Sequence, residues 1–141
     1  MCRGCPSSGR SLLAYQVGRR WQPLDASQVN DYLKDLLGID VSAKDFRTWH
    51  GTVHAAVALA RRPADSVRAR RKGIVEAIEE VAEHLGNTPA VARSAYVDPR
   101  LISLYEHGST IEKTLQRLDK RSQPSSQAQL TVERAVIRLL S

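Results

Sequence analysis

The sequence predicts a mainly α-helical protein with a compact multi-helix domain. Two observations lead to this fold class: apolar residues recur at spacings of three and four along most of the chain, and polar capping residues or glycines separate the periodic segments. Extended patterns are confined to residues 11–21, a stretch too short to build a sheet alone. At 141 residues the chain has room for one domain.

Start and stop signals delimit the expected helices. Asp25 begins the first helix and Gly38 ends it, because a carboxylate caps the free N–H groups of a first turn and glycine tolerates the left-handed conformation that follows a last turn. Thr88 and Pro89 begin a later helix by the same logic. The expected helices cover about 26–37, 43–60, 67–85, 89–96, 99–107, 111–118 and 132–140.

Composition divides the chain into four parts. Residues 1–10 are expected to be a disordered N-terminal remnant and residues 11–118 a helical core fragment. Residues 119–129 have the composition of a linker, and residues 130–141 form a C-terminal helix that is expected to dock on the body. The aromatic residues expected to anchor the core are Trp21, Phe46 and Trp49.

The charge balance indicates a polyanionic partner. Lys and Arg number 21 against 15 Asp and Glu, so the net charge is +6, which favours nucleic acid. No apolar run approaches the roughly 18 residues of a membrane-spanning helix, and no signal peptide is recognised, so a cytoplasmic protein without a membrane partner is expected.

Metal binding is not expected. Cys2 and Cys5 form a single C-x-x-C without a second ligand pair, and they are expected to be reduced thiols. His50 and His54 lie four residues apart on one helix but have no third ligand, and His84 is expected to be a surface residue.

The residues best suited to chemistry lie in two segments. Tyr96 comes near the end of one helix, and Asn87 lies in the turn nine positions earlier, so a phenol and an amide can face the same small space. We interpret Tyr96 as a nucleophile for phosphate. Arg47 is a forked, permanently charged phosphate donor near a helix N-terminus. Gly51 costs its helix about 1 kcal/mol relative to alanine, which indicates close approach of another backbone or a ligand.

Both segments resemble a known family. AKDFRTWHGT (43–52) and LGNTPAVARSAYVDP (85–99), in this order, look like the catalytic core of the bacterial, poxvirus-like type IB DNA topoisomerases. DASQVNDYLKDLLG, which precedes them, fits the same core, and the resemblance covers about residues 11–108. The related tyrosine recombinases carry His in the place of Lys44 and His or Trp in the place of Asn87, so they fit less well.

The resemblance implies a reaction and the residues that perform it. Tyr96 would attack a DNA phosphodiester and form a transient 3′-phosphotyrosyl link. Arg47 and Asn87 would donate hydrogen bonds to the phosphate oxygens, and Lys44 would be a supporting cation. ATP, metal and other cofactors would not be needed. The implied partner is double-stranded DNA, bound by a monomeric protein associated with the nucleoid.

The resemblance also implies that parts of the active site are absent. The family carries another catalytic Arg and a general-acid Lys upstream, the Lys on a β-hairpin, and no residue before Arg47 matches them. Arg10, Arg19 and Arg20 lie in loop-like sequence. We therefore expect an N-terminally truncated catalytic domain with impaired activity, since loss of a general acid typically costs about 10²–10⁴-fold.

Further basic residues are expected to contact the DNA backbone, although a solvated stretch is the default interpretation of such a run. They are Arg61, Arg62, Arg68, Arg70, Arg71, Lys72 and Arg93.

Two alternatives remain open. Residues 81–96 also fit a helix-turn-helix, with Ala82 and Gly86 at the usual small positions, which would make the chain a non-catalytic DNA-binding module. The chain could also be a degenerate remnant that does not cleave DNA.

Overall fold

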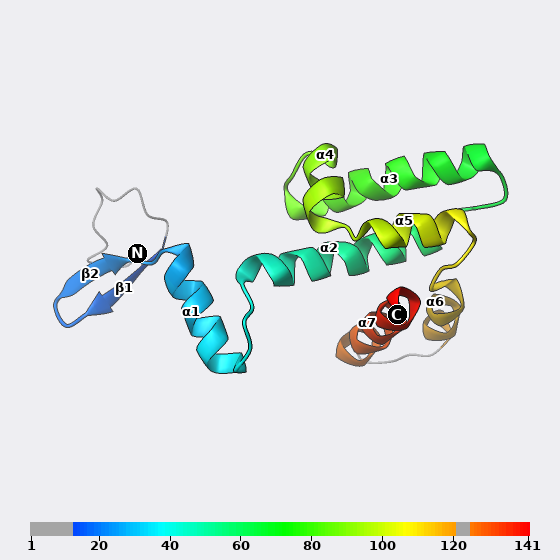
Figure 1. The fold of residues 1–141 in the computed structure, drawn as a ribbon. Coiled ribbons are helices and arrows are strands. Elements are labelled where there is room, and N and C mark those ends of the chain that lie inside the picture. The colour runs from blue at the N-terminus through cyan, green and yellow to red at the C-terminus, as the bar shows by residue number, and fades with distance from the viewer. Residues whose placement is uncertain (1–12, 121–124) are drawn as a thin grey trace. The chain divides into compact units, whose positions relative to one another are not determined.

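The computed structural model describes residues 13–120 and 125–141 and confirms a mainly α-helical chain (Figure 1). Contacts divide the chain into two compact units, Met1–Asp45 and Phe46–Ser141. The elements are β1 (Ala14–Val17), β2 (Arg20–Pro23), α1 (Ala26–Leu37), α2 (Ala43–Ala60), α3 (Val67–Leu85), α4 (Pro89–Val91), the π-helix η1 (Ala92–Tyr96), α5 (Pro99–Glu106), α6 (Glu112–Asp119) and α7 (Ser125–Leu140).

The first unit contains a β-hairpin that the sequence analysis did not predict. β1 and β2 pair antiparallel, with Tyr15 opposite Gln22, and the Tyr15 hydroxyl donates to the Gln22 side chain at 2.9 Å. Gly18 supplies the turn with a φ of +62°. Arg19 and Arg20, expected in loop-like sequence, therefore lie in the turn and on β2, because two short segments joined by a glycine turn pair with each other.

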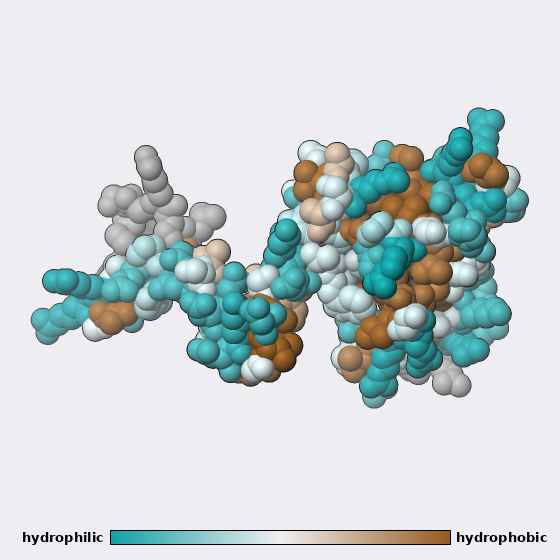
Figure 2. Space-filling model, viewed as in Figure 1, coloured by the Kyte–Doolittle hydropathy of each residue, from teal (hydrophilic) through white to brown (hydrophobic). Residues whose placement is uncertain are grey.

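Helix α1 has the ends that the sequence predicts. Asp25 caps its first turn in a capping box with Gln28, and Gly38 follows its last turn at a φ of +65°. Every residue of α1 is at least partly exposed, and Figure 2 shows hydrophobic surface on this helix. Trp21 is 41% exposed, so the expectation that it anchors the core is wrong. One hairpin and one helix are too small to enclose an interior.

The core of the second unit lies between α2, α3 and α5, with α6 and α7 packed beside them. Its buried side chains include Val53, Ile78, Val81, Leu101, Tyr105 and Val136. Trp49 packs against this core as expected. Phe46 is 49% exposed, which corrects its assignment as a core anchor, because the buried residues of α2 begin only at Gly51.

Two helix boundaries differ from the sequence prediction. Thr88 caps α4 and Pro89 occupies its first turn as predicted, but α-helical geometry ends at Val91, and residues 92–96 form a π-helix. α7 begins at Ser125, so residues 125–129, expected as linker, are helical. Their run of Ser, Gln and Ala, with neither Gly nor Pro, permits continuation of the helix.

Several expectations cannot be compared with the fold. The predicted remnant at 1–10, with Cys2, Cys5 and Arg10, and part of the predicted linker lie outside the described residues. In the part of the chain that is described, no helix is both long and apolar enough to cross a membrane.

Candidate functional site

One face of α2 holds the backbone around Tyr96. The Thr48 hydroxyl donates to the Ala95 carbonyl at 3.4 Å, and the Thr52 hydroxyl donates to the Tyr96 carbonyl at 3.3 Å. Thr52 also accepts a hydrogen bond from the Asp98 amide at 3.2 Å. Carbonyls at a helix C-terminus have no partner within their own helix, so the two threonines satisfy the end of η1.

Gly51 brings α2 and η1 into direct contact. A Cβ atom at this position would lie 2.7 Å from the Tyr96 carbonyl oxygen and 3.2 Å from the Tyr96 Cβ. The close approach predicted for Gly51 is therefore confirmed, and the partner is the backbone of Tyr96 itself. Short π-helical turns occur frequently at functional sites. Here the π-helical turn, and the lack of a side chain at Gly51, together set the position of the Tyr96 backbone and therefore of its ring.

Arg47 and Asn87 converge on one oxygen beside this ring. The Arg47 guanidinium donates to the Leu85 carbonyl, and the Asn87 amide donates to the same carbonyl at 3.3 Å. The Arg47 Cζ lies 5.1 Å from the centroid of the Tyr96 ring, within the range of a cation–π contact. Arg47 is exposed, whereas Asn87 and Tyr96 are half-buried. The second unit thus gathers three of the four residues that the sequence singled out for catalysis.

The carbonyl that Arg47 and Asn87 share carries partial negative charge. Leu85 is the last residue of α3, where the helix dipole gives the free carbonyl oxygens partial negative charge. One charged and one neutral donor aimed at such an oxygen can equally bind a phosphate oxygen. The same contacts also stabilise the C-terminus of α3.

The other predicted site residues differ in their surroundings. Lys44 is exposed in the first turn of α2, within the unit that ends at Asp45. Arg62 pairs with Glu76 and Glu80, and Arg70 donates to the Ala64 carbonyl at 2.7 Å.

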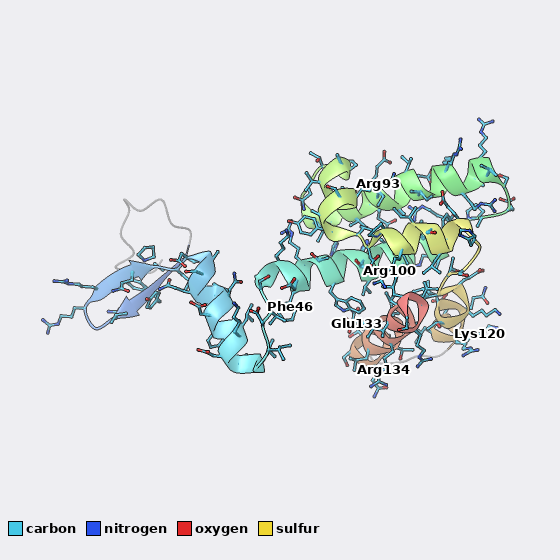
Figure 3. The ribbon with its side chains drawn as sticks, in the orientation of Figure 1. Phe46, Arg93, Arg100, Lys120, Glu133 and Arg134 are labelled. Carbon is cyan, nitrogen blue, oxygen red and sulfur yellow. The ribbon has the colours of Figure 1, made fainter. Side chains whose placement is uncertain are left out.

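The remaining basic positions are more accessible. Lys72 pairs with Glu76 at 3.5 Å but is largely exposed. Arg61, Arg68, Arg71 and Arg93 are exposed and make no ion pair with any described residue, so they are the better placed of the predicted DNA contacts. Figure 3 labels Arg93 on the segment that leads to Tyr96.

Three histidines form a cluster that the sequence analysis missed. His50 and His84 approach to 2.9 Å between their Nε2 atoms, and the His54 and His84 rings stack with centroids 4.5 Å apart. The buried Nδ1 of His54 has no hydrogen-bond partner among the described residues. Burial, and then the charge of His84, lower the pKa of His54. Only the packing of α3 on α2 brings His84 to the predicted His50–His54 pair. No group of three metal-ligating side chains in the described ranges is positioned to hold a metal ion.

Fold and site together define a mainly α-helical protein that holds a tyrosine next to an arginine and an asparagine amide. The family model described as the catalytic core of eukaryotic DNA topoisomerase I matches residues 16–135. The chain therefore belongs to this type I topoisomerase family. The match implies an isomerase-type function and DNA as the partner. No curated protein sequence matches the chain.

Proposed function

We propose that this chain carries the attacking tyrosine of a type IB DNA topoisomerase of the bacterial, poxvirus-like branch. In this proposal it relaxes supercoiled double-stranded DNA through a transient 3′-phosphotyrosyl link, without ATP or metal. The observation that supports it best is the convergence of the Arg47 and Asn87 donors on one oxygen beside the Tyr96 ring.

Tyr96 is the proposed nucleophile. Its phenolic oxygen bonds to the phosphorus of one phosphodiester and loses its proton, while the bond from phosphorus to the 5′ oxygen breaks. Arg47 and Asn87 donate to the non-bridging oxygens as negative charge grows in the transition state, and Lys44 adds a cation. The 5′ oxygen takes up a proton and leaves as a hydroxyl. After the free strand has rotated, the same hydroxyl attacks the phosphotyrosine and restores the DNA.

The proton for the 5′ oxygen limits the rate in this proposal. Among the residues given before Arg47 none is assigned as the general acid, so in an experiment with these 141 residues the proposal takes this proton from water. We expect the chain alone to form the covalent link about 10²–10⁴-fold more slowly than a protein that supplies the acid.

Trapping of the covalent link tests the proposal. The protein is incubated with a pool of nicked duplexes of randomised sequence, in EDTA and without ATP, so that the short fragment downstream of a cut diffuses away and religation fails. A 5′ label on the cut strand should remain on the protein after denaturation, whereas a 3′ label should be released. This pattern is specific for a link through the 3′ phosphate.

Two matched variants control the trapping experiment. Tyr96→Phe removes one oxygen and should abolish the adduct. Tyr32→Phe removes the same atom from an exposed tyrosine of α1 and should leave the adduct unchanged. An adduct that persists in Tyr96→Phe, or that carries the 3′ label, would contradict the proposed chemistry.

DNA binding without cleavage is the second candidate function. The packing of α3 against α4 and η1 through the turn at Gly86 favours it, because these elements retain a helix–turn–helix order. The second helix is short, however, with three α-helical residues before the π-turn. Salt-sensitive binding of duplex DNA, with no adduct after long incubation, would favour this candidate or a degenerate remnant over the enzyme.

A further inference from the structure

A cleft between α6 and α7 lies outside the Tyr96 cluster and is lined by basic residues. The two helices pack against each other, and the cleft has a volume of about 230 Å³. Its lining residues from α6 are Thr114, Arg117 and Leu118, and those from α7 are Thr131, Arg134, Ala135 and Arg138. Helical spacing explains the arrangement on α7, because residues three and four positions apart share one face.

The charge in this cleft is not compensated by the protein. No carboxylate lines the cleft, and the side chains of Arg117, Arg134 and Arg138 make no hydrogen bond or ion pair with the residues that the structure describes. Two carboxylates on the same helices accept hydrogen bonds from glutamine amides instead: Glu112 accepts from Gln116 at 2.9 Å, and Glu133 accepts from Gln129 at 2.7 Å.

Three guanidinium groups that line one cleft repel one another, and an anion bound in the cleft would reduce this repulsion. All three arginines are exposed, and Figure 3 shows Arg134 projecting from α7. Half-buried Leu118 and Ala135 add apolar surface to the lining of the cleft. The arrangement differs from Arg62 and Arg100, whose guanidinium groups are paired with carboxylates on the protein itself.

We propose that the α6–α7 cleft binds a phosphate group of the DNA backbone, at a place separate from the phosphodiester that Tyr96 would attack. The forked donors of arginine match the oxygens of a phosphate, and the Thr114 hydroxyl adds an uncharged donor at the α6 wall. The volume holds several water molecules at about 30 Å³ each, so a phosphate group fits without rearrangement of the helices.

DNA is the favoured source of this phosphate for two reasons. The three arginines that line the cleft are exposed, which suits a group that remains attached to a polymer running across the surface. The family also implies DNA as the partner. The inference rests on the proposed function only for the identity of the polyanion. It predicts that α6 and α7 help to hold the duplex while the Tyr96 cluster acts on another phosphate.

The salt dependence of duplex binding tests whether the cleft binds a phosphate of the DNA backbone. Fluorescence anisotropy with a 5′-labelled duplex is measured at several salt concentrations for the full chain and for Arg134→Gln. Loss of this contact should weaken binding about tenfold at low salt. It should also reduce the slope of log Kobs against log salt by about one. The matched control is Lys113→Gln, which removes one positive charge from α6 outside the cleft and should change both quantities much less.

Arg134→Lys keeps the charge but loses the fork, so its affinity should lie between those of the full chain and Arg134→Gln. Thermal unfolding of each variant checks that exposed substitutions on α7 leave the fold intact. A parallel titration with inorganic phosphate at fixed ionic strength should raise the unfolding temperature of the full chain more than that of Arg134→Gln.

The outcomes separate the cleft from the proposed function. Equal losses of duplex affinity in Arg134→Gln and Lys113→Gln would overturn the proposal that the cleft binds DNA, because net charge would then explain the binding. Unchanged duplex binding in Arg134→Gln, with loss of the phosphate effect, would make the cleft a small-anion site and overturn the DNA assignment. A full chain that binds no duplex would overturn the proposed function and this inference with it, whereas duplex binding without an adduct affects only the proposed cleavage.

Discussion

Replacing Gly51 by alanine tests whether α2 positions Tyr96. The new Cβ would lie 2.7 Å from the Tyr96 carbonyl oxygen, where ordinary contacts begin at about 3.4 Å, and the atom that must yield is backbone. Alanine is ordinarily about 1 kcal/mol more favourable than glycine within a helix, whereas overpacking costs about 1–3 kcal/mol. We expect the free energy of unfolding to fall by about 0–2 kcal/mol, because these two effects oppose each other.

Displacement of Tyr96 should affect chemistry more than stability. A misplacement of about 1 Å can cost 10²-fold in rate, and the smaller shift expected here should slow adduct formation by roughly 10–100-fold. Urea unfolding and single-turnover trapping on the nicked duplex measure the two quantities. Gly73→Ala on α3 is the matched control, since its Cβ would meet the Tyr105 hydroxyl at 2.6 Å and should disturb stability without slowing the adduct. A Gly51→Ala protein that is more stable and equally fast would refute the reasoning.

Three further predictions concern the same unit. Thr52→Val removes the hydroxyl that donates to the Tyr96 carbonyl, and leaving buried polar groups unsatisfied should cost about 1–3 kcal/mol in urea unfolding. Arg47→Lys keeps a charge but loses the fork, so trapping should slow by about 10²–10³-fold while stability changes little at this exposed position. Burial and the charge of His84 lower the pKa of His54, so the folded state should lose stability as pH falls below about 6.5.

Each of these predictions has an outcome that contradicts it. Thr52 is only 3% exposed, so a Thr52→Val protein as stable as the unchanged protein would contradict the first prediction. A loss of stability in Arg47→Lys as large as its loss of rate would assign Arg47 to capping of α3 alone. For the pH dependence, His54→Gln is the control and should flatten the stability curve between pH 7 and pH 5. A curve that rises toward acid, or one unchanged in His54→Gln, would contradict the assignment to His54.

Local signals predicted much of this protein correctly. Asp25, Gly38, Gly86 and Thr88 end or begin helices at the expected positions, because capping depends on hydrogen bonds within one turn. The close approach at Gly51 could also be inferred, because a glycine in the middle of a helix lowers stability and therefore indicates that another group occupies the space of a side chain. These inferences succeed because they depend on residues a few positions apart.

Other features depend on contacts that no local pattern contains. The carbonyls of Ala95 and Tyr96 at the end of η1 accept hydrogen bonds from threonines on α2 that lie 47 and 44 positions earlier in the chain. Trp21 and Phe46 were expected in the core because of their size, but burial depends on whether neighbouring elements cover them. His84 was expected to be an isolated surface residue, and the arginines of the α6–α7 cleft were not singled out, because only packing gathers each of them into a cluster.

The sequence by itself determined the helices, their caps and the short set of side chains capable of binding a phosphate. Capping, periodicity and side-chain chemistry act over one or two turns and can be inferred from neighbouring residues. Only the tertiary structure decided that Arg47 reaches across 38 positions to the Leu85 carbonyl, beside Asn87 and over the Tyr96 ring. That meeting depends on how closely α2 packs against the end of α3 and against η1, and this is a property of the packed helices together.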